Sequence, residues 1–237
     1  SDLPVFSLQL KSLHKFFKLE DLESFLIVAS KADFDKVKAF VKTENLNYNN
    51  AFPFQVVSMA AIIPELVFLT KHTEAESAPY YKSHQFGFIS RMIVKLAAAD
   101  WFQGFYLALD ADVLCTGPSS FAKLVQNGRA VVQSSPIKPE DEYQWKGALH
   151  VLDGGAKMVG RSVGGIPSIY HRAAVQKLKT YLEVIYQQPW RYSLLRYLYG
   201  WTDSSLYFSF LKMSKMFDSY YVVGVQKGML VSGDVIL

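Results

Sequence analysis

A short apolar run that ends in two acidic residues constrains the fold of this chain most. The run covers residues 105–109 (Phe-Tyr-Leu-Ala-Leu), and Asp110 and Asp112 follow it directly. Continuous apolar runs of this length are typical of strands that are buried on both faces of a parallel sheet. In such sheets ligands bind outside the carboxyl ends of the strands. We therefore expect Asp110 and Asp112 to lie where a ligand would bind.

Helical and strand-like patterns alternate along the rest of the chain. No internal repeat and no linker rich in Gly, Ser or Pro divides it, so we expect residues 1–237 to form a single domain. The alternation predicts an α/β fold with a mostly parallel central sheet and helices on both faces. We expect helices near 4–17, 34–41, 84–99, 172–186 and 203–217, strands near 25–29, 56–68, 105–109, 128–133, 220–225 and 229–231, and a polar loop at 136–147.

Composition excludes several classes of protein. Half of the 237 residues are hydrophobic, which excludes a disordered chain. The net charge of +4 is too small for a protein that mainly binds nucleic acid. No apolar run approaches the roughly 20 residues of a transmembrane helix. The single cysteine, Cys115, excludes an intramolecular disulfide; we expect a cytoplasmic protein, with peripheral attachment to a membrane left open.

The paired aspartates could bind a divalent cation. Side chains alternate along a strand, so Asp110 and Asp112 would point the same way, and a turn there can aim both into a crevice. Oxygen ligands of this kind suit Mn²⁺ or Mg²⁺, with water and substrate phosphates in the remaining positions. The alternative is that the two residues only end a strand and cap a turn.

Four segments in a fixed order carry a family resemblance. Residues 95–113 (KLAAADWFQGFYLALDADV) resemble the helix, strand and Asp-x-Asp signature of GT-A-fold nucleotide-sugar glycosyltransferases, in particular a poorly characterised bacterial and viral group. Pro64-Glu65, residues 164–170 (GGIPSIY) and residues 202–207 (TDSSLY) are similar to further segments of that family. The resemblance spans most of the chain and implies a GT-A-like (Rossmann-like) fold.

The resemblance implies metal-dependent transfer of a sugar from a nucleoside-diphosphate sugar, with a UDP-sugar favoured, to a hydroxyl of a glycan or another acceptor. Asp110 would lie near the ribose and the metal, Ala111 would line the donor site, and Asp112 would bind the metal beside the diphosphate. Asp203 would be the general base of an inverting displacement. The simpler alternative is that Asp203 belongs only to a helix cap, with Thr202 as another cap; the two roles are compatible.

The chain departs from the family pattern at both ends. Members usually begin with a strand that contacts the nucleotide base, whereas this sequence starts with what resembles the following helix. Either a strand precedes Ser1 in the natural protein, or residues 25–29 substitute for it. Many members also supply a late His as a third metal ligand, and no His follows His171. That ligand would be water or would lie beyond Leu237.

Further residues could contact the donor or the acceptor, but each could instead have a purely structural role. Arg91 and Lys95 are one helical turn apart and could contact diphosphate oxygens, or they could form a solvated helix face. Ser30 and Asp33 follow a predicted strand and could contact the nucleoside. An acceptor or sugar pocket could include the aromatic residues, whose alternative role is core packing. We expect it to involve Tyr143, Trp145, Trp201, Gly164 and Gly165.

Rival functions are less well supported by the sequence. Residues 160–164 (GRSVG) fit the nucleophile elbow of a serine hydrolase, but His171 is the last histidine and follows too closely to complete a triad. Residues 155–162 lack the lysine of a P-loop, because Arg161 stands in its place. The alternative that stays open is a non-catalytic sugar- or nucleotide-binding module of the same fold.

Overall fold

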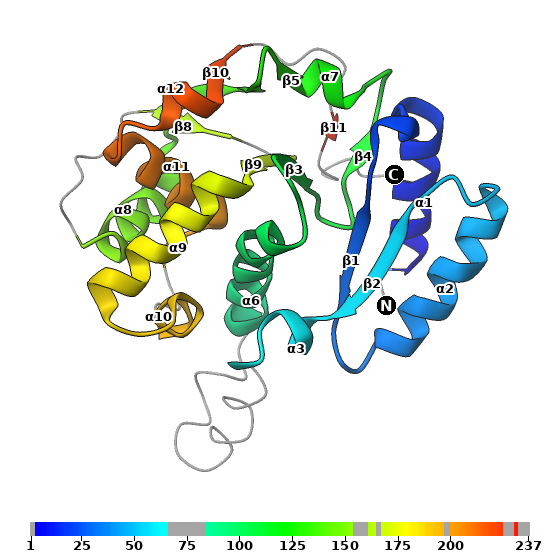
Figure 1. The fold of residues 1–237 in the computed structure, drawn as a ribbon, viewed down its shortest axis with the longest axis horizontal. Helices are drawn as coiled ribbons and strands as arrows, with labels where there is room; N and C mark the ends of the chain where they lie inside the picture. Colours follow the sequence, from blue (N-terminus) through cyan, green and yellow to red (C-terminus); the bar gives the residue numbers. More distant parts are fainter. Residues whose placement is uncertain are drawn as a thin grey trace.

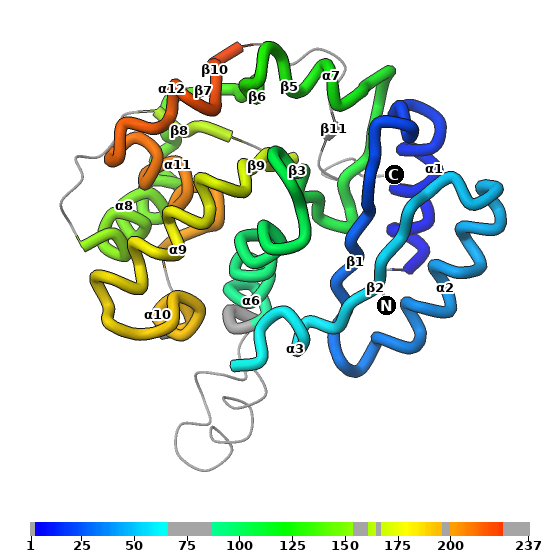
Figure 2. Tube along the Cα trace, in the orientation of Figure 1, coloured from blue at the N-terminus to red at the C-terminus, as the bar shows by residue number. Residues whose placement is uncertain are grey.

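The computed structural model describes residues 3–65, 84–153, 161–164, 167–196, 200–224 and 230–231. The fold is mixed α/β. Helices gather in two groups, one beside strands β1 and β2 and one around the long helix α9, and helix α6 lies between the two groups (Figures 1 and 2). None of the described helices combines the length and the apolar character needed to cross a bilayer.

The N-terminal part is a helix followed by two parallel strands. Helix α1 (Leu3–Phe16) leads through the turn η1 (Leu19–Asp21) to β1 (Phe25–Ala29), and α2 (Phe34–Asn47) connects β1 to β2 (Phe54–Ser58). Strand β1 pairs with β2 in parallel along its whole length. The buried side chains of α1 include Phe6, Leu10 and Leu13, the three-to-four residue spacing of an amphipathic helix.

The central part carries the apolar run into the core. After α3 (Met59–Ile62), helix α6 (His84–Ala97) and the turn η2 (Ala98–Asp100) lead to β3 (Phe105–Ala108). Strand β3 pairs antiparallel with β9 (Ser168–His171), which continues into α9 (Arg172–Tyr186).

The remaining elements complete the described part of the chain. They are β4 (Leu114–Cys115), α7 (Phe121–Leu124), β5 (Val125–Gln126), β6 (Arg129–Val132), β7 (Ser134–Pro136), η3 (Pro139–Asp141), α8 (Glu142–Val151), β8 (Arg161–Val163), α10 (Trp190–Arg196), α11 (Asp203–Met213), α12 (Phe217–Tyr220), β10 (Tyr221–Val223) and β11 (Leu230–Val231).

The sheet arrangement corrects one expectation. The α/β class is confirmed, but the described residues form small, mixed pairings in place of a mostly parallel central sheet. Parallel pairing joins β1 to β2 and β6 to β10, whereas β3–β9, β4–β11, β5–β6 and β7–β8 are antiparallel. An apolar run identifies a buried strand, but it does not encode which distant strand will pair with it.

Several predicted elements are confirmed, one is wrong and one strand was missed. Strand β1 and helix α9 have the predicted bounds. The predicted loop at 136–147 is wrong, because helix α8 begins at Glu142 and buries Trp145, Ala148 and Val151 on one face. Strand β9 was not predicted. Its four residues are too few for a clear local pattern, and they form a strand by pairing with the distant β3.

A close backbone contact fixes helix α8 in its group. A Cβ added at Gly147 would lie 1.6 Å from the carbonyl oxygen of Gly200, whose own φ of +80° is in the left-handed region. The two backbones can therefore approach only because position 147 carries no side chain.

Candidate functional site

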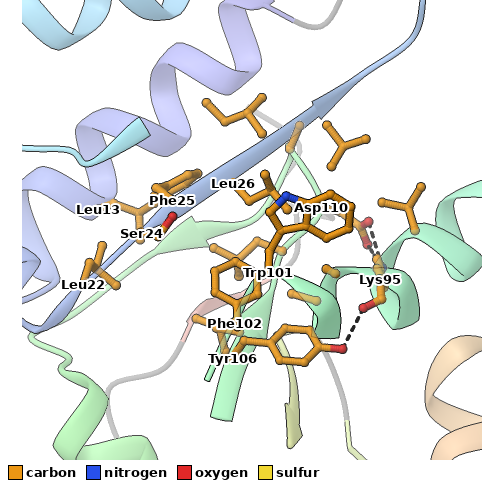
Figure 3. Close-up of a pocket in the computed structure, with 18 of the residues that line it drawn as sticks. Leu13, Leu22, Ser24, Phe25, Leu26, Lys95, Trp101, Phe102, Tyr106 and Asp110 are labelled. Carbon is orange, nitrogen blue, oxygen red and sulfur yellow. Dashed lines mark hydrogen bonds and ion pairs between the residues drawn. The ribbon is translucent and has the colours of Figure 1, made fainter. Parts of the chain in front are cut away.

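A cavity of about 1300 Å³ lies between β1 and β3 and extends to the turn that follows β3. Residues of α1, β1, α6 and β3 line it (Figure 3). Most of its wall is apolar, but one part is charged. Six of the predicted donor-site residues line this cavity, and this set is called here the polar end: Ser30, Arg91, Lys95, Asp110, Ala111 and Asp112.

The Lys95–Asp110 ion pair is the centre of the polar end. Lys95 Nζ lies 2.9 Å from Oδ1 and 3.1 Å from Oδ2 of Asp110, and the two side chains are only 13% and 29% exposed. Tyr106 donates a hydrogen bond from its hydroxyl to the Lys95 carbonyl at 2.8 Å, and Gln9 Nε2 donates to the Asp110 carbonyl at 2.7 Å. These bonds hold the backbone of both charged residues, so the pair is preorganised.

Asp112 is the exposed carboxylate of the polar end. Strand β3 ends at Ala108, and the Val113 amide donates to the Asp110 carbonyl at 3.2 Å, so Asp110 and Asp112 lie in a turn. Both line the same cavity, as a site for a hard cation requires. Within the described ranges no three His, Cys, Asp or Glu side chains are grouped to hold a metal ion. A cation at Asp110 and Asp112 would have to take its other ligands from water or from a substrate.

Asp203 lies behind the polar end and does not line the cavity. It is the first residue of α11, whose N-cap is Thr202; Thr202 and Ser205 form a capping box. Asp203 is 3% exposed and accepts a hydrogen bond from the Tyr170 hydroxyl. Burial raises the pKa of the Asp203 carboxyl above its usual value, the charge of Lys95 and the Tyr170 hydrogen bond oppose this shift, and the charge of Asp110 adds to it.

Arg91, Ser30 and Asp33 make contacts separate from the Lys95–Asp110 pair. Arg91 is exposed, and its guanidinium lies 6.0 Å from the centre of the Phe88 ring. Ser30 donates its hydroxyl hydrogen to Asp33 Oδ2 at 2.7 Å and accepts from the Asp33 amide at 3.1 Å. Ser30 lines the cavity, but Asp33 does not and serves as the N-cap position of α2.

The residues expected in an acceptor pocket are not brought to the cavity. Trp145 and Trp201 are 5% and 1% exposed and pack in the core, so neither presents a free ring face to a sugar. Tyr143 is exposed on α8, and Gly165 lies outside the described residues. Gly164 has a φ of +94°, and a Cβ there would lie 2.6 Å from the Phe208 ring, so its role in the structure is close packing.

Several cavity residues were missed from the sequence. Gln9, Phe25, Trp101 and Phe102 line the cavity, and Trp101 is 40% exposed. Trp101 is part of the segment that resembles the glycosyltransferases, and that signal could have singled it out. Gln9 lies in an amphipathic helix far from Asp110 in sequence, and nothing local indicates their contact.

A solved structure with a similar fold and a matching family model are known for this chain. The crystal structure of mouse xyloside xylosyltransferase 1 in its apo form is similar, with a TM-score of 0.51 and 15% sequence identity; the alignment covers 94% of this chain and 80% of that chain. A similarity at this identity concerns the fold. No curated protein matches the sequence. A family model described as "Family of unknown function (DUF6492)" matches residues 1–232, and the chain therefore belongs to the DUF6492 family.

Proposed function

We propose that this protein is a metal-dependent glycosyltransferase that moves a sugar from a nucleoside-diphosphate sugar to an acceptor hydroxyl. The polar end carries the proposal: a preorganised Lys95–Asp110 pair lies beside Asp112 and Arg91 at one cavity. The fold shared with a xylosyltransferase supports the same reaction class. The name of that xylosyltransferase supports only one part of the proposal for this chain, the transfer of a sugar.

The two aspartates are the proposed ligands of Mn²⁺ or Mg²⁺. Asp112 is exposed and available, whereas Asp110 already bonds Lys95 and can offer its remaining lone pairs. When bound, the ion would neutralise the charge that develops on a nucleoside-diphosphate leaving group.

The basic residues of α6 are proposed to bind the donor diphosphate. Lys95 and Arg91 both line the cavity one helical turn apart. Lys95 is held by Asp110, so its ammonium has a fixed position from which to donate to a phosphate oxygen. Arg91 is exposed and supplies a second, more adaptable donor.

Asp203 is the proposed general base for an inverting displacement. A base must accept the proton of the attacking hydroxyl, and a pKa raised toward neutrality improves that transfer. Burial raises the Asp203 pKa in the required direction. The Tyr170 hydroxyl donates to the same carboxylate and limits its orientation. We propose a UDP-sugar as donor and a glycan hydroxyl as acceptor.

The burial of Asp203 also supports a second candidate. A side chain that is 3% exposed and does not line the cavity has no open path to an acceptor in this conformation. A non-catalytic module that binds a sugar or nucleotide at the polar end would need no base. The transferase and the binding module would use the same donor site, but only the transferase would turn the donor over.

A donor screen tests the proposal. Thermal unfolding is followed with UDP-, GDP- and dTDP-sugars, each with Mn²⁺ and with EDTA, because a ligand that binds only the native state raises the Tm by mass action. The transferase predicts a Tm rise for one donor with Mn²⁺ and slow hydrolysis of that donor. The binding module predicts the rise without hydrolysis. No rise for any donor would reject both.

A further inference from the structure

Helix α1 lies alongside the segment 110–119, which carries both aspartates of the polar end (Figure 1). Hydrogen bonds join the two at successive turns of the helix. They run from Gln9 Nε2 to the Asp110 carbonyl at 2.7 Å, from the Cys115 amide to Ser12 Oγ at 2.9 Å, and from the Ser119 amide to the Phe16 carbonyl at 2.8 Å. The contacts advance in step along the helix and the segment, so α1 supports the whole segment.

Gln9 is the polar residue on the buried face of α1. The other buried residues of this helix are Phe6, Leu10 and Leu13. Gln9 is only 2% exposed, and burying an amide is costly unless it is hydrogen-bonded. An apolar side chain at position 9 would avoid that cost. The bond from Gln9 to the Asp110 carbonyl therefore explains why a glutamine stands here.

The Ser12 hydroxyl has a fixed orientation. It donates its hydrogen to the Gln9 carbonyl at 2.7 Å, which leaves its lone pairs free to accept the Cys115 amide. Val113 and Cys115 are 0% and 1% exposed, so this part of the segment is anchored in the core. Gln9 and Ser12 therefore hold the turn that contains both aspartates from its two sides.

The position of Asp112 depends on the backbone of this turn. Its carboxylate is exposed and makes no hydrogen bond or ion pair with any residue that the structure describes. Asp110, in contrast, is also held through its side chain by Lys95. Whatever fixes the backbone between residues 110 and 115 consequently fixes where the two carboxylates lie relative to each other.

We propose that Gln9 and Ser12 are positioning residues, which hold Asp110 and Asp112 in the arrangement that binds a divalent cation. This inference rests on the proposed function. Both residues act on backbone groups of the turn, the Asp110 carbonyl and the Cys115 amide, and not on the carboxylates themselves. Loss of groups that orient metal ligands typically lowers metal affinity about 10–100-fold. Part of the cation affinity therefore comes from a glutamine 101 positions before Asp110.

Mn²⁺ binding to matched variants tests the inference. Ser12→Thr keeps the hydroxyl, and Thr in a helix can bond the same backbone carbonyl, whereas Ser12→Val has nearly the same shape as Thr without the hydroxyl. Gln9→Met removes the amide at similar length. Ser7→Ala is the control on the same helix, because the Ser7 hydroxyl donates to Glu44 and not to the turn. Free Mn²⁺ is measured by EPR during titration in the presence of UDP, and the Tm of each protein is measured with EDTA.

The positioning role predicts a loss of affinity that follows the hydrogen bonds. Ser12→Val and Gln9→Met should bind Mn²⁺ at least about tenfold more weakly than the wild type. Ser12→Thr and Ser7→Ala should bind it as the wild type does. A lower Tm with unchanged Mn²⁺ affinity in Ser12→Val and Gln9→Met would make these bonds purely structural and overturn the inference, as would equal losses in Ser12→Thr and Ser12→Val. No Mn²⁺ binding by the wild type would instead reject the cation site of the proposed function, and the positioning role with it.

Discussion

We expect substitutions of Lys95 and Asp110 to lower the stability of the fold in a non-additive way, because the two side chains form an ion pair. Two unit charges about 4 Å apart at an effective dielectric constant of about 20 attract by about 4 kcal/mol. Side chains that are 13% and 29% exposed lose much of their hydration, which offsets a large part of that attraction. We expect a net coupling of about 1–2 kcal/mol, above the ~0.2–1 kcal/mol of fully exposed pairs.

A double-mutant cycle measures this coupling. Lys95→Met, Asp110→Asn and the double variant are unfolded in urea with EDTA present, and tryptophan fluorescence reports the transition. Each single change should lower the free energy of unfolding by about 1–3 kcal/mol, because it leaves a partly buried group without its partner.

The double variant should lose less than the sum of the single losses by the coupling energy. Arg91→Met is the matched control on the same helix; its side chain is exposed, so we expect a change within about 0.5 kcal/mol. Single losses that add to within about 0.5 kcal/mol would refute a preorganised pair.

Two further variants test packing and the environment of Asp203. Gly147→Ala should destabilise by about 3 kcal/mol or more, because its Cβ would overlap the Gly200 backbone, whereas Gly87→Ala, with open space around it, should be neutral or stabilise by up to ~1 kcal/mol in urea unfolding. Similar losses for both would contradict the close contact. Tyr170→Phe should raise the pKa of Asp203 further above 3.8. A raised carboxyl pKa contributes stability that is full below the unfolded value and is lost as pH rises through the folded value. Urea unfolding from about pH 4 to 7 should therefore show a larger loss with rising pH in Tyr170→Phe; equal pH dependence would contradict the hydrogen bond.

The sequence predicted several local features of the fold well. Strand β1 is a continuous apolar run between polar residues, and α9 has a sustained amphipathic period, so both bounds were predicted correctly. The segment that contains Asp110 and Asp112 also follows a strand as predicted, although Tyr106 is the only fully buried residue of that strand. These features depend on residues that are near one another in the chain.

Features that depend on distant residues were not predicted. Strand β9 exists through its pairing with β3, and the two are more than 60 residues apart. Lys95 was proposed as a phosphate ligand, but its ion pair with Asp110 forms only when α6 folds against the turn after β3. Burial of Trp145 and Trp201 depends on how the helices pack, so their sequence positions alone did not show that both lie in the core.

Calorimetry of UDP binding tests the proposed metal-dependent donor site most directly. UDP is titrated into the wild-type chain, into Asp112→Asn and into the control Asp35→Asn, an exposed carboxylate outside the cavity, with Mn²⁺ and with EDTA. We expect Mn²⁺ to tighten UDP binding to the wild type and to Asp35→Asn. In the presence of Mn²⁺, Asp112→Asn should bind UDP at least about tenfold more weakly than the wild type, a difference of about 1.4 kcal/mol. Its Tm should be unchanged, because the Asp112 side chain is exposed. Equal Mn²⁺-dependent affinity in Asp112→Asn and the wild type would contradict the assignment of this site.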